Sequence, residues 1–432
     1  MDLKKEIKLS DLFRRGKKEP AEDVPTEELP VAEAPKKSRF ARKPKAEKPA
    51  KQPKQPKQPK EPKAPKAPKA RRELGVPRRG KKLVGLKIGA SQLAAAQVVN
   101  NGHPELVQVA REPIELGIVV GGELREPDAL ADALKRFFRV NKLPRQSVRL
   151  GIASNRIGVR IFDIVGIEDE KQLHNAVRFR AQEALPIPLD EAVLDYHVLS
   201  ESVDEDGVRT RRVLLVVAYR DLVDRYVAAC RKAGLRIAGV DLEAFAVLRA
   251  LGGASSQGNA AVVVASVGHD RTTLAVANGN VCEFTRVIEW GGHNLNVAIA
   301  RALDSAPSEV EPIKRSLSLL VPAESWEALG REQAAKVRAA LTQELQSFAR
   351  ELVSSLQFYQ GQPGSLGIGE IVLTGGTAHL PGLDAELARA IGVRVRVGDP
   401  LARVKPGKRV VDPEQLGSLA VAIGLGIEEP LS

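Results

Sequence analysis

Two short glycine turns with nearby hydroxyl groups are the parts of this sequence best suited to hold a phosphate. In the first turn, Gly89 is followed by Ser91. In the second, Gly268 is followed by Thr272 and Thr273, and we expect one of the two hydroxyls to face a ligand. Glycine lets backbone amides approach an anion closely, and a hydroxyl adds a further donor. Two such turns facing each other would hold a polyphosphate from opposite sides.

A third glycine turn follows the apolar run Ile371–Leu373, which suits a strand that is buried on both faces. The turn itself is Gly375-Gly376-Thr377, and its two glycines remove two Cβ atoms where the strand ends. Such a turn fits a binding site for a nucleoside or a phosphate. It is also typical of an ordinary tight connection between a strand and a helix, and the turn alone does not separate these two interpretations.

The elements that position the first two turns occur twice along the chain. Each turn joins two alternating apolar stretches into a hairpin, and a third strand and then a helix follow each hairpin. This repetition predicts a duplicated α/β fold with its ligand between the halves. The predicted hairpins are Leu83–Val99 and Ala261–Ala277, the third strands Glu105–Ala110 and Asn280–Ile288, and the helices Pro127–Val140 and His293–Leu303.

A small α+β insert, at about 145–220, is predicted within the first half. Its helix runs from about Glu168 to Ala184 and stops at Pro186, because proline cannot continue a helix. A module of this kind usually mediates contacts rather than chemistry. The predicted strands of this region are Val148–Ala153, Ile157–Val165, Val193–Leu199 and Arg212–Tyr219, followed by a helix at Asp221–Ala233 and a strand at Arg236–Val240.

The positive charge of the chain is confined to its first part. The 432 residues carry a formal charge of +12. Residues 1–82 contain 27 Lys and Arg against 12 Asp and Glu, a net +15, so the remainder has a net charge of −3. The length predicts two or more domains, and the folded part is not itself basic.

This basic Lys/Pro-rich tail is predicted to be disordered. From Lys51 it repeats lysine and proline with a period of three, which favours polyproline II with the lysines along one edge. The stripe suits a semi-rigid spacer, or a contact with anionic lipid or an acidic protein. No aromatic residue is interleaved with the lysines, which argues against nucleic acid. Residues 1–15 fit either a short amphipathic docking helix or a disordered terminus.

Cysteine, histidine and hydropathy patterns exclude several classes of protein. Cys230 and Cys282 have neither metal-ligand nor disulfide spacing, so we expect buried, reduced thiols. No apolar run approaches a membrane span, and the start of the chain lacks the apolar core of a signal peptide. We therefore expect a cytoplasmic protein. No metal site is predicted from the six scattered histidines, His103, His174, His197, His269, His293 and His379.

Together, the paired hairpins and the stretch Glu311–Ser318 resemble the actin and heat-shock chaperone ATPase superfamily over about 83–428. The resemblance implies that Glu311 accepts hydrogen bonds from ribose and that Lys314 lies beside the nucleoside. It also assigns Ser318, Gly375, Gly376 and Thr377 to the nucleotide site. Without the resemblance, Glu311 and Lys314 are equally read as a solvated pair on one helical face.

Within this superfamily, the sequence is similar to the PilM family of actin-like type IV pilus assembly proteins, which resembles the cell-division protein FtsA. The most specific segment is Glu183–Tyr196, because it lies in the insert rather than in the shared nucleotide core. Further segments are Val84–Ser91, Val240–Ala246, Trp290–Leu295 and Leu373–Gly376. FtsA-like proteins usually end in a membrane-targeting helix, and this chain stops at Ser432 without one. FtsA is therefore the second choice of family, after PilM.

The family resemblance implies a two-lobed actin-like (ribonuclease H-like) fold with an SHS2-like insert, the first lobe at 83–240 and the second at 241–432. A helical subdomain is expected at about 303–365. The implied partners are ATP, the cytoplasmic N-terminal peptide of a PilN-like inner-membrane protein, the pilus motor complex and further copies of the chain. The implied role is a scaffold in the cytoplasm, peripheral to the inner membrane through its partners, in a pilus, secretion or DNA-uptake machine.

Two departures from the superfamily concern its metal and its catalysis. The superfamily has aspartates at the positions of Lys87 and Ser266, and both act through Mg²⁺ and the attacking water. An ammonium at Lys87 cannot rebuild that metal arrangement, although it can neutralise a phosphate directly. His269 and Asp270 fit either partial substitutes or ordinary turn residues. We therefore expect weak or no hydrolysis, or no nucleotide at all; an active ATPase of the FtsA type is the alternative.

Overall fold

The computed structural model describes residues 81–184, 188–252, 260–279, 281–408, 410 and 416–428. The predictions for the basic tail, its docking helix and its polyproline II spacer lie outside these residues, as does the helix stop at Pro186.

The first lobe contains a six-stranded sheet in which an antiparallel hairpin is flanked by parallel strands. β1 pairs antiparallel with β2 and parallel with β6, and β6 in turn pairs parallel with β10. In sheet order the strands are β10 (Ile237–Leu242), β6 (Val148–Ile152), β1 (Lys81–Ile88), β2 (Gln92–Asn101), β3 (His103–Pro113) and β16 (Lys405–Pro406).

The second lobe repeats this arrangement in a five-stranded sheet. Its hairpin strands β11 and β12 are antiparallel, and β14 and β15 add parallel strands on the β11 side. In sheet order the strands are β13 (Val281–Ile288), β12 (Thr272–Asn278), β11 (Ala261–Val267), β14 (Ile368–Thr374) and β15 (Arg394–Val397). The shared strand order confirms the predicted duplicated α/β fold.

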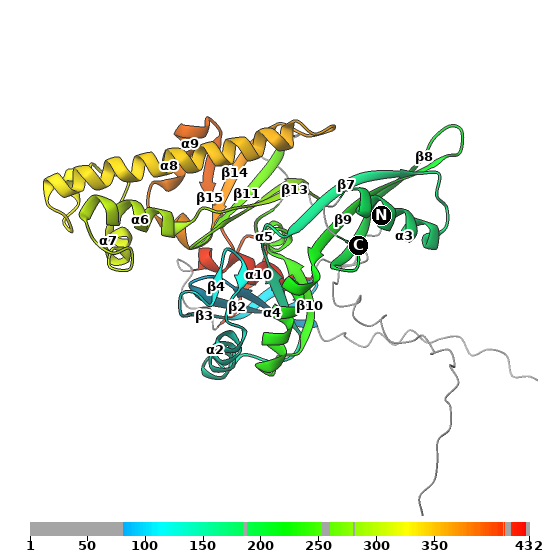
Figure 1. Cartoon of the computed structure of the whole chain (residues 1–432), viewed down its shortest axis with the longest axis horizontal. Coiled ribbons are helices and arrows are strands. Elements are labelled where there is room, and N and C mark those ends of the chain that lie inside the picture. The colour runs from blue at the N-terminus through cyan, green and yellow to red at the C-terminus, as the bar shows by residue number, and fades with distance from the viewer. Residues whose placement is uncertain are drawn as a thin grey trace, which may run out of the picture. The chain divides into compact units, whose positions relative to one another are not determined.

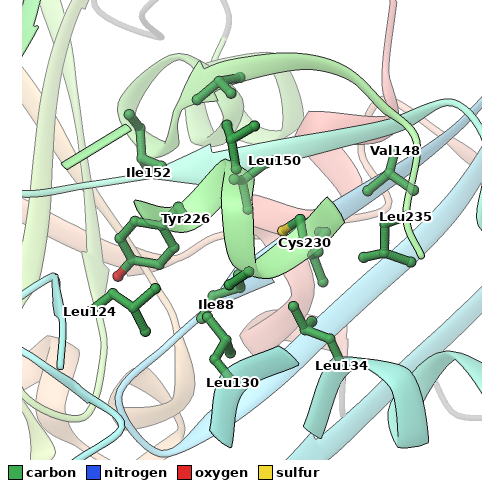
Figure 2. Packing of buried hydrophobic residues seen from close by; sticks show 14 of the residues in the cluster. Ile88, Leu124, Leu130, Leu134, Val148, Leu150, Ile152, Tyr226, Cys230 and Leu235 are labelled. Carbon is green, nitrogen blue, oxygen red and sulfur yellow. The ribbon is translucent and has the colours of Figure 1, made fainter. Parts of the chain in front are cut away.

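Two helices cover the core of the first lobe. α2 (Pro127–Val140) starts with proline, whose missing amide costs nothing there, and it buries Leu130, Leu134, Phe137 and Phe138 along one face. α4 (Arg220–Lys232) packs beside it and contributes Tyr226 and Cys230. Figure 2 shows Leu130 and Leu134 of α2 and Tyr226 and Cys230 of α4 around Ile88 of β1 and Leu150 of β6. A short hairpin of β4 (Val119–Val120) and β5 (Glu123–Leu124) connects β3 to α2.

The helices of the second lobe pack on one face of its sheet. The longest is α8 (Arg331–Gln360), which lies beside β14 in Figure 1. Its Phe348 stacks on Trp290 with ring centroids 3.7 Å apart. The other helices here are α6 (Gly292–Leu303), α7 (Glu311–Ser316) and α9 (Leu383–Ile391), with short 3-10 turns η1 (Ala323–Ser325) and η2 (Gly376–His379).

The two lobes are joined through α5 (Glu243–Leu251) and α10 (Ala420–Gly426). A Cβ atom added to Gly85 would lie 2.0 Å from the carbonyl oxygen of Ala422, so glycine is needed for α10 to reach β1. The buried Arg149 donates to the carbonyl oxygens of Leu425 and Ile427 at the end of α10. α10 and β16 pack against the first sheet, although both lie within the range 241–432 predicted for the second lobe.

The insert has its own small core. Its elements are β7 (Ile157–Val165), α3 (Glu170–Ala184), β8 (Ala192–Val203) and β9 (Arg209–Tyr219). The strands form a sheet in the order β7–β9–β8, and α3 buries Leu173, Val177 and Ala181 at helical spacing against this sheet. The strand predicted at Val148–Ala153 is β6, which lies in the first sheet between β10 and β1 rather than in the insert.

Both cysteines are free and buried. Burial raises the pKa of the Cys230 and Cys282 thiols to about 12, so they stay protonated at neutral pH. Across the part of the chain that the structure describes, no helix combines the length and apolar character needed to cross a bilayer.

Candidate functional site

A cleft of about 1030 Å³ opens where the two hairpin tips face each other. The first lobe supplies the end of β1, the tip around Ser91 and the end of β3. The second lobe supplies the tip around His269, the start of α6, α7, and the turn after β14. The cleft is large enough for a ligand of nucleotide size.

Both hairpin tips have the same backbone geometry. The amide of Gly89 donates to the carbonyl oxygen of Gln92 at 3.0 Å, and the amide of Gly268 donates to that of Arg271 at 2.9 Å. Each turn therefore spans four residues and starts at a glycine. An added Cβ would lie 3.1 Å from the Gln92 oxygen at Gly89 and 2.9 Å from the Arg271 oxygen at Gly268, so both tips are closely packed on themselves.

Three hydrogen bonds hold the second tip against its own lobe. The Gly268 carbonyl oxygen accepts from the amide of Gly292 at 3.0 Å and from the hydroxyl of Thr377 at 2.8 Å. The carbonyl oxygen of His269 accepts from the amide of His293 at 2.7 Å. The tip, the start of α6 and the turn after β14 therefore form one rigid wall of the cleft.

Glu311 and Lys314 of α7 form a polar network on this wall. Glu311 Oε2 accepts from Lys314 Nζ and from Asn296 Nδ2, both at 2.7 Å, and Lys314 also donates to the carbonyl oxygen of Gly292. Burial acts to raise the pKa of Glu311, but these hydrogen bonds outweigh it and lower the pKa to about 2. Burial lowers the pKa of Lys314, and its pairing with Glu311 offsets only part of that effect.

The first lobe places an ion pair at the base of the cleft. Lys87 Nζ lies 3.3 Å from Oε2 of Glu243, the first residue of α5, whose side chain is only 2% exposed. Leu86 and Ile88 point into the core of the first lobe, so strand alternation directs Lys87 to the opposite face. The pair ties β1 to α5, the helix that joins the lobes.

Among the buried side chains that the structure describes, four polar atoms lack a hydrogen-bond partner, and three belong to residues that line this cleft. These three are Oε1 of Glu243, Nη1 of Arg271 and Oδ1 of Asn296. Unsatisfied buried polar groups are costly, and their concentration in one cleft indicates a site that is completed by a ligand or by water.

Most of the residues proposed for nucleotide binding line the cleft, namely Lys87, Gly89, Ser91, Gly268, Thr273, Glu311, Lys314, Gly376 and Thr377. Thr272, Ser318 and Gly375 do not. Thr272 faces away and donates to the carbonyl oxygen of Trp290. Ser318 lies beyond α7, which ends at Ser316. Gly375 has φ 91° and packs against the backbone of Val267.

Several polar residues of the cleft had no role predicted from the sequence, namely His293, His379, Glu243 and Arg271, whereas His269 was a candidate. His269 and His293 lie with ring centroids 5.4 Å apart, and burial first, then His293 and Lys314, lower the pKa of His269. His379 also lines the cleft. The buried Glu243 carries no local sequence signal, because its partner Lys87 is distant in the chain.

The cleft offers amides, hydroxyls and cationic groups from two sides, an arrangement suited to a polyanion. Over the described ranges, no group of three or more His, Cys, Asp or Glu side chains is placed to hold a metal ion. The acidic side chains of the cleft instead pair with lysine, arginine or backbone amides. For example, Oδ1 of Asp270 lies 3.6 Å from Nη1 of Arg271.

Comparison with known proteins gives a consistent family. The family model described as type IV pilus assembly protein PilM matches residues 85–429. The cell division protein FtsA of Escherichia coli K12 is 27% identical over 364 residues, covering 74% of this chain and 84% of that protein. FtsA of Bacillus subtilis 168 is 22% identical, covering 65% and 70%.

Among solved structures, the PilM-PilN type IV pilus biogenesis complex aligns with a TM-score of 0.66 at 25% sequence identity. The alignment covers 80% of this chain and 97% of the matched chain. This likeness confirms the predicted actin-like fold.

Proposed function

The chain belongs to the family of the type IV pilus assembly protein PilM, and on this premise we propose that it is a scaffold of a type IV pilus machine or a related secretion or DNA-uptake machine. In this proposal it binds the cytoplasmic N-terminal peptide of a PilN-like membrane protein. It holds ATP in the cleft between its lobes and hydrolyses it weakly or not at all. It lies in the cytoplasm, against the inner membrane through its partner.

The observation that carries the scaffold role is the similarity to a protein solved in complex with PilN. That similarity extends over 97% of the matched chain, so it includes both lobes and the insert rather than the nucleotide core alone. A shared core by itself would support only the fold, because one fold hosts many functions.

The scaffold role is tested by peptide binding. A fluorescent peptide with the cytoplasmic N-terminal sequence of the organism's PilN-like protein is titrated with the full chain, and anisotropy is measured. We expect saturable binding that a scrambled peptide of the same composition does not show. Equal signals from both peptides, or no binding, would contradict the partner assignment. Contacts with the motor complex and self-assembly are further predictions for the same protein.

ATP binding is supported by the cleft itself. Its opposed glycine tips, the Glu311–Lys314 network and the three buried polar atoms without a hydrogen-bond partner provide donors and acceptors for phosphate and ribose. Calorimetric titration with ATP tests the proposed binding. Glu311→Ala is expected to weaken it, because the substitution removes the carboxylate proposed to accept hydrogen bonds from the ribose. The matched control is Glu324→Ala on the exposed η1 turn.

An active ATPase of the FtsA type is a second candidate, favoured by the 27% identity to FtsA over most of that protein. Phosphate release distinguishes the two. We expect the wild type to release phosphate no faster than the buffer control. Turnover in the wild type that disappears in Glu311→Ala would establish the ATPase and overturn the low-turnover proposal.

A further inference from the structure

The position of Lys87 places a fixed positive charge next to the first hairpin tip. Lys87 precedes the tip by two residues, and its backbone lies opposite Ala94 of β2 and Gly151 of β6. Its side chain is 16% exposed and lines the cleft. Because Lys87 is fixed on β1 next to the tip, its charge lies close to any ligand that the tip amides bind.

The partner of Lys87 is an acid that water does not reach. Glu243 is 2% exposed, its Oε2 lies 3.3 Å from Lys87 Nζ, and its Oε1 has no hydrogen-bond partner. Gly151 of β6 lies beside this side chain, since an added Cβ there would be in ordinary contact with Glu243 Cγ at 3.5 Å. A buried carboxylate needs a counter-charge, and Lys87 supplies it to Glu243 at the base of the cleft.

The oxygen donors near the tips do not fit Mg²⁺, the ion that the superfamily resemblance implies. Mg²⁺ requires an octahedral shell of oxygen atoms, usually with one or two carboxylates. Here the Glu243 carboxylate already faces an ammonium, which would repel a divalent ion at the same oxygens. At the second tip the corresponding side chain is the buried hydroxyl of Ser266, and Asp270 accepts from the amide of Gly121.

From this arrangement we infer that Lys87 replaces the divalent metal of the cleft, so that the site binds the nucleotide as a metal-free polyphosphate. Arg271 adds a second cation from the opposite tip: it lines the cleft, and its Nη1 makes no hydrogen bond and lies 3.6 Å from Oδ1 of Asp270. The ammonium of Lys87 contacts a phosphate oxygen, and Glu243 holds the ammonium in place through the ion pair. The inference rests on the proposed binding of ATP in this cleft, and it adds that this binding needs no divalent metal ion.

The test is calorimetric titration of the full chain with ATP, once in EDTA and once in excess Mg²⁺. We expect ATP to bind in EDTA at least as tightly as in Mg²⁺. Lys87→Met is expected to weaken binding in EDTA by about tenfold or more, as the loss of one charged contact would. Lys135→Met, on the exposed face of α2, is the matched control and is expected to bind like the wild type.

Lys87→Met leaves Glu243 buried without a partner, so its effect on folding must be separated from its effect on the ligand. The double variant Lys87→Glu with Glu243→Lys keeps an ion pair and reverses its direction. It places a carboxylate beside the phosphates, so we expect it to bind ATP only when Mg²⁺ is present. Circular dichroism checks that the variants are folded.

The outcomes separate this inference from the proposed function. Wild-type binding that disappears in EDTA would overturn the inference and leave ATP binding intact. A reversed pair that binds equally in EDTA and Mg²⁺ would overturn it as well. The absence of ATP binding under both conditions would overturn the nucleotide part of the proposed function, and the inference with it.

Discussion

The backbone amide of Gly121 donates a hydrogen bond to Oδ2 of Asp270 at 2.8 Å, so the short β4–β5 hairpin of the first lobe is tied to the second hairpin tip. Asp270 was predicted either to substitute for a catalytic acid or to be a simple turn residue. In the structure its carboxylate bridges the two lobes at the edge of the cleft.

Replacing Asp270 with alanine is expected to loosen this bridge. The hydrogen bond has a charged acceptor, so its loss should cost about 1.5–3 kcal/mol of unfolding free energy at most, less where water replaces it. Amide hydrogen exchange should accelerate at Gly121, because its donor is released. Asp224→Ala, on the exposed face of α4, is the control. Unchanged exchange at Gly121 would mean that the bridge does not form in solution.

The hydroxyl of Thr377 is expected to position the second tip. Thr377→Val keeps the shape of the side chain but removes the donor to the Gly268 carbonyl oxygen. We expect a loss of about 1 kcal/mol in urea unfolding, together with weaker ATP binding in calorimetry. Thr342→Val removes a similar hydroxyl bond on α8, far from the tips, and should leave ATP affinity unchanged. If both variants bind ATP alike, the tip does not depend on this bond.

The two glycines of the turn after β14 are expected to differ sharply in their tolerance of alanine. Gly375 has φ 91°, and an added Cβ would lie 2.3 Å from the Val267 carbonyl oxygen, so Gly375→Ala should cost at least about 2 kcal/mol. An added Cβ at Gly376 meets nothing within 4 Å, so Gly376→Ala should fold normally. Thermal unfolding of the two variants measures the difference. Equal melting temperatures would contradict the assigned turn.

Glu311 is expected to give the protein a defined loss of stability in acid. Its pKa of about 2 lies below the ordinary value of 4.5, so the ionised form stabilises the folded state above about pH 4.5. That contribution is lost as the pH falls through the range from 4.5 towards 2. Urea unfolding of the wild type and Glu311→Gln should therefore differ most at neutral pH and converge on acidification.

The control for this acid effect is Glu332→Gln, which removes a fully exposed acid paired with Lys336 on α8. Its difference from the wild type should be smaller and should weaken with added salt, because water screens an exposed pair. A Glu311→Gln difference that stays constant from pH 7 to acid would show that the Lys314 and Asn296 bonds do not lower this pKa.

Secondary-structure elements that depend only on neighbouring residues could be predicted from the sequence. Alternating apolar residues and a glycine at each tip were enough to predict both hairpins, since strand periodicity and turn conformation are local properties. The helix Pro127–Val140 was predicted with its observed bounds, because its start proline and apolar spacing are also local. The repetition of these elements indicated the duplicated fold.

Contacts between distant side chains could not be predicted and became known from the folded chain. The ion pair of Lys87 with Glu243 and the bridge from Gly121 to Asp270 join residues from distant segments. Thr272 turned out to face away from the cleft, because the register of β12 gives that side to Thr273. Side-chain pairing depends on distances that strand order and crossover connections fix, and no short stretch of sequence contains that information.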